Sequence, residues 1–221
     1  MKAIEKRIPE ARPVGKDGPH RLATLAEAGF ECHDLGDAHT FWTGRLPDNL
    51  RFDAANFEAL WRMRPPEYHE ILMHGRVLKT PRWQQAYGMD YRYTRRVNRA
   101  LPVPLLLEPL LAWARTQIDE RLNSILVNWY DALLGHYMGR HRDSTGEMLK
   151  GVSIVTVSLG EERIFRLRPY RGKGRRDFPA LDGSVFIMPY ETNLAWTHEV
   201  PRARKFSGSR ISVTFRGFLK D

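Results

Sequence analysis

The chain has 221 residues, a formal net charge of +9 and one cysteine, Cys32, and its length suits a single domain with its own core. One cysteine excludes a disulfide framework and any zinc or iron–sulfur site built from cysteines. No stretch of about 18 apolar residues occurs, which excludes a membrane-spanning helix, and the first residues lack the apolar segment of a secretory signal.

The N-terminal half predicts an irregular segment followed by helices. Residues 1–40 form a predicted N-terminal extension, and residues 1–20, which are polar and basic, are expected to be poorly ordered. A helix is expected over residues 53–64, where Asp53 precedes apolar residues at helical spacing and would be the N-cap. A longer apolar stripe predicts a second helix over residues 104–122.

The C-terminal half predicts strands. Five short segments are rich in β-branched and aromatic residues and are separated by loops that contain glycine. They are residues 124–130, 152–159, 163–168, 184–188 and 209–218. No helical pattern lies between them, which argues against a parallel sheet with crossover helices and favours a sandwich, jelly roll or barrel. The predicted fold class is α+β, with a mainly β core and the N-terminal helices packed on it.

The positive charge is concentrated in three stretches. Residues 76–99, 163–176 and 202–220 carry net charges of +6, +7 and +6, so the rest of the chain sums to −10. Such segregation is typical of a surface that binds a polyanion such as a nucleic acid. The alternative is three solvated basic loops.

A possible metal site combines two histidines and one carboxylate. His141 and Asp143 are two positions apart, so an extended backbone would point both side chains the same way. His198 follows the predicted strand 184–188 in a polar stretch. This ligand set can hold Fe(II) on one face and leave other positions open, although zinc accepts the same ligands. The alternative is that these are ordinary polar residues.

Two of the predicted strands carry polar residues on one face. Successive side chains of the last predicted strand point to opposite faces. One face is apolar and would pack on the core, and the opposite face carries two arginines and two hydroxyl groups. Buried guanidiniums need an anion, and a bound dicarboxylate would suit their planar fork. Strand 124–130 adds an amide and a phenol on one face. These residues are Arg210, Ser212, Thr214, Arg216, Asn128 and Tyr130. The alternative for the last strand is an edge strand with a wet polar face.

Taken together, these motifs resemble the AlkB family of Fe(II)/2-oxoglutarate-dependent dioxygenases. The family pattern is N-x-Y, H-x-D, a distal His and R-x-N-x-T-x-R, and the chain matches it in order, except that Ser212 replaces the Asn. Residues 80–93, TPRWQQAYGMDYRY, are similar to the family's nucleotide-recognition lid. The likeness extends from about residue 80 to the C-terminus. Ser144 follows Asp143 where many nucleic-acid demethylases of the family carry an acidic residue.

The resemblance implies a fold, a cofactor set and residue roles. The fold would be a double-stranded β-helix, or jelly roll, over residues 41–221, with a lid at about residues 80–96. Iron would be held by His141, Asp143 and His198, and O₂ would take an open position on it. The 2-oxoglutarate would be bound by Asn128, Tyr130, Arg210, Ser212, Thr214 and Arg216.

The implied activity is oxidative demethylation of N-alkylated bases in DNA or RNA, as in the repair of alkylation damage. The candidate substrate contacts are Tyr87, Tyr91, Arg92, Tyr93, Ser144 and Arg171. Two alternatives stay open: a dioxygenase of the same fold that hydroxylates a protein or a small molecule, and a nucleic-acid binder without activity. We expect a monomer without a membrane partner, located in the cytoplasm, or in the nucleus of a eukaryote.

Overall fold

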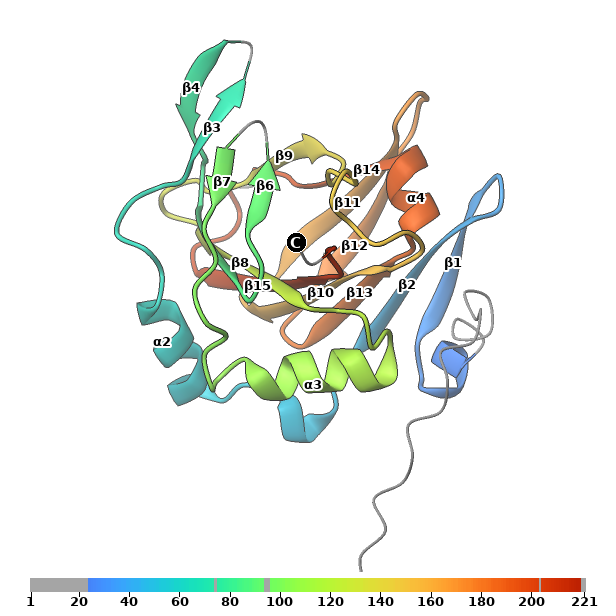
Figure 1. Cartoon of the computed structure of the whole chain (residues 1–221), viewed down its shortest axis with the longest axis horizontal. Helices are drawn as coiled ribbons and strands as arrows, with labels where there is room; N and C mark the ends of the chain where they lie inside the picture. Colours follow the sequence, from blue (N-terminus) through green and yellow to red (C-terminus); the bar gives the residue numbers. More distant parts are fainter. Residues whose placement is uncertain (1–23, 74, 94–95, 203, 220–221) are drawn as a thin grey trace, which may run out of the picture.

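Two antiparallel sheets lie face to face at the centre of the computed structural model (Figure 1), which describes residues 24–73, 75–93, 96–202 and 204–219. The larger sheet has the strand order β1-β2-β13-β10-β15-β8-β5, and the smaller has the order β12-β11-β14-β9. The predicted mainly β jelly-roll fold is confirmed. The predicted disorder of residues 1–20 lies outside the described residues.

The strands of the two sheets include all five segments that the sequence predicts. The larger sheet contains β1 (Glu31–Gly36), β2 (His39–Arg45), β5 (Trp83–Tyr87), β8 (Ser124–Asp131), β10 (Ile154–Gly160), β13 (Ser184–Met188) and β15 (Ser209–Arg216). The smaller sheet contains β9 (Met138–His141), β11 (Arg163–Pro169), β12 (Arg176–Ala180) and β14 (Trp196–Val200).

The remaining elements are two hairpins and short helices. One hairpin, β3 (Glu70–Met73) with β4 (Arg76–Lys79), projects away from the sheets beside the second, β6 (Tyr91–Tyr93) with β7 (Arg96–Asn98) (Figure 1). The helices are α2 (Ala54–Arg62), α3 (Glu108–Gln117) and α4 (Tyr190–Ala195), with a 3-10 turn at Asp48–Leu50. Among the described residues, no helix has the length and apolar character needed to cross a bilayer.

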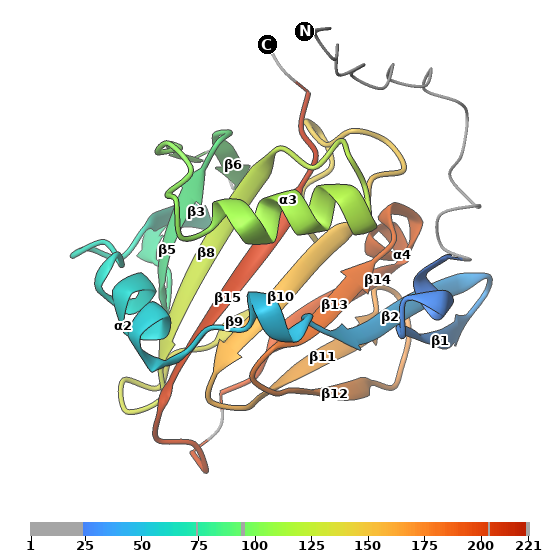
Figure 2. The same cartoon turned by 90° about the horizontal axis from the view of Figure 1, so that it is seen from below.

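Helix α3 lies across the outer face of the larger sheet (Figure 2). Its predicted stripe is confirmed, because Leu110 and Ala114 are buried in a core that also contains Val127 of β8 and Val213 of β15. Each large side chain buried in this way, such as leucine or valine, stabilises the fold by roughly 1.5–3 kcal/mol. The helix is shorter than predicted: it begins at Glu108, because the residues before it form a turn.

Helix α2 begins at the predicted N-cap. The Asp53 carboxylate accepts a hydrogen bond of 2.7 Å from the backbone N–H of Asn56, which satisfies one of the free donors at the helix start. The helix packs Leu60, which is fully buried, into the same core as α3. The two predicted helices therefore cover the side of the larger sheet that faces away from the smaller one.

A second core fills the space between the sheets. Phe41, Phe165 and Phe186 pack there with ring centroids 4.8–5.9 Å apart. Phe165 also stacks on the ring of His198, with a centroid distance of 5.6 Å and an interplanar angle of 11°. This aromatic cluster therefore fixes one wall of the polar region described below.

Several elements differ from the prediction. The N-terminal half also contains strands: residues 31–40, which the sequence placed in a separate extension, contribute β1 and the start of β2, and β2 pairs with β13 in the larger sheet. In the predicted lid, residues 83–87 form β5 at the edge of that sheet, next to β8. Helix α4 was not predicted, because six residues are too short to show a helical period.

Candidate active site

The two faces of β15 separate the protein core from a polar cavity. Ile211, Val213 and Phe215 lie in the core beneath the helices. The alternate residues line a cavity between the two sheets, and they are Arg210, Ser212, Thr214 and Arg216. In the neighbouring β8, Asn128 and Tyr130 line the same cavity, opposite Ser212 and Arg210 respectively. The predicted alternation of both strands is therefore confirmed.

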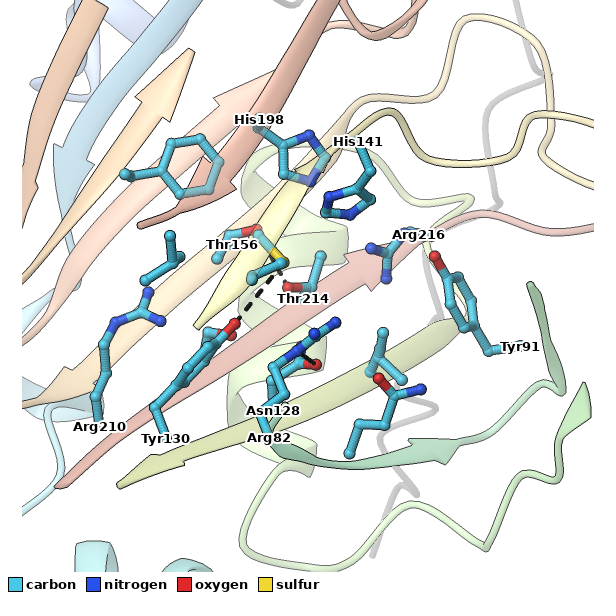
Figure 3. Close-up of a pocket in the computed structure, with 16 residues that line it drawn as sticks. Arg82, Tyr91, Asn128, Tyr130, His141, Thr156, His198, Arg210, Thr214 and Arg216 are labelled. Atoms are coloured by element: carbon cyan, nitrogen blue, oxygen red, sulfur yellow. Dashed lines mark hydrogen bonds between the residues drawn. The ribbon is translucent and has the colours of Figure 1, made fainter. Parts of the chain in front are cut away.

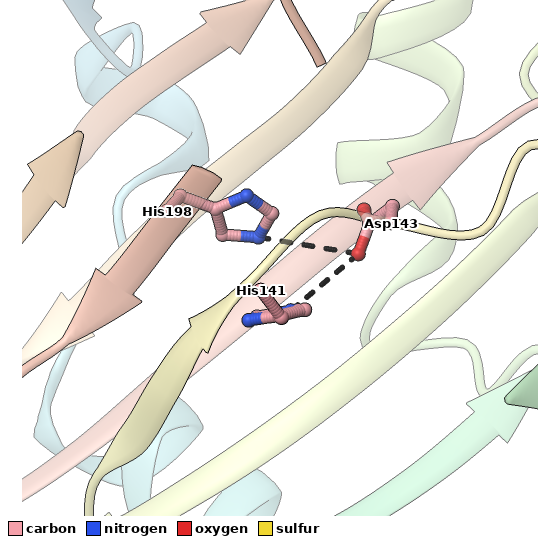
Figure 4. A group of neighbouring side chains, drawn as sticks. All are labelled: His141, Asp143 and His198. Carbon is pink, nitrogen blue, oxygen red and sulfur yellow. Dashed lines mark ion pairs between the residues drawn. The ribbon is translucent and has the colours of Figure 1, made fainter. Parts of the chain in front are cut away.

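The three predicted metal ligands come together at one end of this cavity. His141 ends β9, Asp143 lies two residues later, and β14 places His198 directly opposite His141. The Nε2 atoms of His141 and His198 are 3.6 and 3.9 Å from Oδ1 of Asp143 (Figure 4). One ligand atom from each residue lies within 4.8 Å of the others. Strand pairing therefore converts distant sequence positions into one possible metal site.

The protonation states of His198 and Asp143 are suited to binding a metal cation. Nδ1 of His141 donates to the carbonyl oxygen of Gly139 at 2.8 Å, which turns Nε2 toward Asp143. Burial, with a smaller contribution from His141, lowers the pKa of His198 to about 3. Burial would raise the pKa of Asp143, but Arg216 and the two histidines hold it well below its usual value. His198 is thus neutral and Asp143 charged at neutral pH.

Two contacts hold Asp143 in place. Arg216 donates from Nε to Oδ2 at 2.9 Å, and its Nη2 pairs with the same oxygen at 2.7 Å, which leaves Oδ1 to face the histidines. The backbone N–H and carbonyl of Asp143 bond to the side-chain amide of Asn193, at 3.0 and 3.1 Å. Arg216 thus binds a carboxylate of the chain itself, and its role toward 2-oxoglutarate stays a prediction. Asn193 lies on α4 and is fully buried.

Arg210 lies at the opposite end of the cavity and lacks an acidic partner there (Figure 3). It is fully buried, and its Nε donates to Oγ of Ser158 at 2.9 Å. Nη1 and Nη2 find no hydrogen-bond partner among the described residues. The ring of Tyr130 lies 5.0 Å from the guanidinium carbon. Burial lowers the pKa of Arg210, and a buried guanidinium with two free donors is suited to bind a carboxylate.

The residues therefore fit both implied groups. The His–Asp–His donor set is one that holds Fe(II) and leaves positions open for other ligands. The unpaired fork of Arg210 lies in the same cavity as His141 and His198. A small dicarboxylate would satisfy that fork while its other end lies toward the metal site.

The predicted substrate contacts are divided between the cavity and the surface. Tyr91 lines the cavity, and its hydroxyl is 3.4 Å from Oδ1 of Asp143. Tyr87 faces the other way and is buried in the core with the helices, so it does not line the cavity. Tyr93 ends β6, but its side chain lies outside the described part of the structure.

The other three predicted contacts lie outside the cavity. Arg92 is partly exposed and pairs with Glu147 at 3.3 Å. Ser144 lines a separate hollow next to Asp143. Arg171 lies in the loop between β11 and β12 and lines a third hollow. All three roles stay predictions.

The sequence interpretation missed several cavity residues. Arg82 and Gln84 line the cavity on the β5 side, and Arg82 donates to Oδ1 of Asn128 at 2.8 Å. Both polar atoms of the Gln84 amide are buried without a partner among the described residues. A period-two reading of residues 82–86 would have placed them on one face. Asn193 had no such signal, because it acts from the short α4.

The three basic stretches are only partly a surface feature. Arg82, Arg163, Arg210 and Arg216 are buried. Others pair with acids, as Arg166 does with Asp177 at 2.6 Å. The net charge of a stretch therefore overstates the positive surface that it supplies.

The low pKa of His198 predicts a pH-dependent stability of the metal-free protein. Below pH 6.5 the unfolded chain binds a proton at this residue, while the folded chain stays neutral there down to about pH 3. The unfolded state then binds more protons, so stability should fall as the pH drops, by as much as about 1.4 kcal/mol per pH unit. Urea unfolding between pH 7 and pH 4.5 would measure this slope.

A His198→Gln variant provides the control for that measurement. Burial also lowers the pKa of His69 and His136, so the slope should become smaller in the variant without disappearing. A variant with the same slope as the wild type would contradict the assignment to His198.

Comparison with known proteins identifies the family. A family model described as the 2OG-Fe(II) oxygenase superfamily matches residues 50–216, which include the three candidate metal ligands and all of β15. The chain belongs to the 2OG-Fe(II) oxygenase superfamily. Fe(II), 2-oxoglutarate and O₂ are the cofactor and co-substrates that this superfamily implies, as the resemblance to AlkB predicts.

Curated relatives include AlkB homologues. Human DNA oxidative demethylase ALKBH2 is 30% identical over 160 residues, which cover 67% of this chain and 61% of the human protein. Bovine alpha-ketoglutarate-dependent dioxygenase alkB homolog 3 is 25% identical over 230 residues, which cover 98% of this chain and 76% of the bovine protein. The match thus spans about three fifths of the human relative. The predicted resemblance to the AlkB family is confirmed.

Solved oxygenase structures share the fold. OsALKBH1 has a TM-score of 0.56 and 14% identity over 84% of this chain and 99% of its own. An oxidoreductase of the 2OG-Fe(II) oxygenase family from Burkholderia pseudomallei has a TM-score of 0.52 and 18% identity over 93% of this chain and 92% of its own. At these identities the likeness shows the fold alone.

Proposed function

We propose that the protein is an Fe(II)/2-oxoglutarate-dependent oxidative demethylase that removes N-alkyl groups from bases of DNA or RNA. The observation that carries this proposal is the joint placement of a His–Asp–His site and an unpaired buried guanidinium in one cavity. The relatives named as DNA oxidative demethylases support the choice of substrate. The predicted monomeric state and compartment stay predictions.

The chain's own residues would perform four tasks. His141, Asp143 and His198 would hold the iron, and Arg216 would keep the Asp143 carboxylate charged and oriented. Arg210 would bind the distal carboxylate of 2-oxoglutarate. When bound, iron, 2-oxoglutarate and O₂ supply the oxidation of an N-methyl group, which leaves as formaldehyde while succinate and CO₂ form. The buried cavity walls would exclude water from this chemistry.

An aromatic residue beside the candidate metal ligands supports a base as the substrate. Tyr91, from the β6–β7 hairpin, lies beside the metal ligands, and Arg216 lies 4.8 Å from its ring. An aromatic side chain at this place suits stacking against an unpaired base. A base inside a duplex cannot reach a buried metal, so it would be flipped or already single-stranded.

Turnover on methylated oligonucleotides tests the proposal. The full chain, supplied with Fe(II), 2-oxoglutarate and O₂, should release formaldehyde and succinate from oligonucleotides that carry N-methylated adenine or cytosine. Single- and double-stranded forms of DNA and RNA should be compared with unmethylated controls. The absence of substrate-dependent formaldehyde across the whole panel would overturn the proposal.

A further inference from the structure

A basic hollow lies outside the candidate active site. It has a volume of about 580 Å³ and is lined by the β11–β12 loop, by the turn between β1 and β2, and by the start of β14. Four of its lining residues are cationic, and they are Arg171, Lys173, Arg175 and Arg176. Asp37 and His39 also line it. We call this space the hairpin hollow.

The charge of the hairpin hollow is only partly neutralised. Arg175 lies 3.8 Å from Asp177, and Arg176 donates to the backbone carbonyl of Asp34 at 3.4 Å. Arg171 and Lys173 are exposed and form no ion pair with a described residue, and the guanidinium carbon of Arg171 lies 5.8 Å from the centroid of the Tyr170 ring. Arg166 and Arg168 of the preceding strand β11 instead pair with acids. Neither Arg171 nor Lys173 has an acidic partner among the described residues, so both can bind an anion.

Tyr170 provides an exposed aromatic surface in the same hollow. Its side chain is 44% exposed, although its backbone N–H donates to the Ala195 carbonyl at 2.8 Å and so fixes its position. The Arg142 guanidinium packs against the ring, with its carbon 3.7 Å from the ring centroid. Arg142 is itself anchored by a bond of 2.6 Å to the Leu194 carbonyl. Arg142 thus holds the exposed Tyr170 ring in place, and the two cations beside it lack acidic partners among the described residues.

The hairpin hollow is connected to the metal site through Arg142. The same arginine that packs on Tyr170 also lines the hollow that contains Asp143 and Ser144. The chain therefore presents, in order, a metal ligand, a bridging guanidinium, an aromatic ring and a group of cations. A strand of nucleic acid offers the complementary order, because its bases and phosphates alternate along one backbone.

We infer that the hairpin hollow binds a single-stranded segment next to the modified base, with one unpaired base stacked on Tyr170 and its phosphates near Arg171 and Lys173. This inference rests on the proposed function and names the form of its substrate. Stacking on Tyr170 requires a base with a free face, which the neighbours in a duplex cover. The arrangement therefore favours single strands over duplexes.

Binding of unmodified oligonucleotides by the metal-free full chain tests the inference. Fluorescence anisotropy should compare a labelled single strand with its duplex. Tyr170→Ala should raise the Kd for the single strand roughly tenfold, as expected for loss of one base–aromatic stack. Tyr170→Phe, which keeps the ring, should bind like the wild type, and all three proteins should bind the duplex alike.

The electrostatic part has its own control. Lys173→Gln should reduce the slope of log Kd against log salt concentration by about 0.7 for single strands. Arg115→Gln, which removes an exposed charge from α3, should leave the slope unchanged. An unchanged Kd in Tyr170→Ala, or an equal loss for the duplex, would overturn the inference. Because the assay uses neither methylated bases nor turnover, that failure would leave the proposed demethylation untouched.

Discussion

Replacing Asp143 by alanine should abolish formaldehyde release and also destabilise the protein. The first effect follows from loss of the single carboxylate among the three candidate ligands. The second arises because Arg216, 3% exposed, would lose its acidic partner at 2.7 Å. Breaking a buried ion pair in this way costs about 3–5 kcal/mol. Turnover assays and urea unfolding would measure the two effects.

A double variant separates the two roles of Asp143. In Asp143→Ala/Arg216→Met both charges are removed, and replacement of a whole buried pair by apolar groups is often neutral or stabilising. We expect the double variant to recover most of the free energy of unfolding while turnover and Co(II) binding stay lost. Retained activity in Asp143→Ala would contradict the ligand assignment. Persistent instability of the double variant would contradict the importance of the ion pair.

Replacing Arg210 by methionine should weaken 2-oxoglutarate binding without lowering the stability of the protein. The variant would lose two charge-assisted hydrogen bonds to the distal carboxylate, each worth about 1.5–3 kcal/mol, so the KM for 2-oxoglutarate should rise about a hundredfold or more. The free energy of unfolding without 2-oxoglutarate should not fall. The reason is that Arg210 is buried and its Nη1 and Nη2 atoms have no partner among the described residues.

Arg210→Lys is the matched control for this prediction. Lysine keeps the positive charge but lacks the planar fork, so the KM for 2-oxoglutarate should lie between those of the wild type and Arg210→Met. Initial rates at varied 2-oxoglutarate concentration would provide these values, and urea unfolding would provide the stabilities. An unchanged KM in Arg210→Met would mean that another residue anchors the acid.

The grouping of polar residues on the cavity wall was predictable because it follows from strict local rules. The period of two in residues 210–216 places alternate side chains on opposite faces of any strand, whatever it pairs with. The spacing of His141 and Asp143 likewise fixes their relative direction in an extended backbone. The apolar stripe of α3 predicted a helix that packs on the sheet. These patterns determined the cavity wall, the shared direction of His141 and Asp143, and the main elements.

Other features depended on contacts between distant segments. The sequence analysis assigned Arg216 to 2-oxoglutarate, and only the fold brings it to Asp143, 73 residues away. Likewise, only the fold brings the amide of Asn193 to the backbone of Asp143, and places β1 and β2 beside β13. The direction of Tyr87 also required the register of β5 against β8.

The sequence alone thus determined which residues share a face, because that depends on backbone geometry within one segment. The tertiary structure decided which charges are paired, because an ion pair requires two side chains to meet across strands. Two buried arginines of the same strand differ in this way. Arg216 pairs with Asp143, whereas Nη1 and Nη2 of Arg210 have no partner among the described residues and remain available for a ligand.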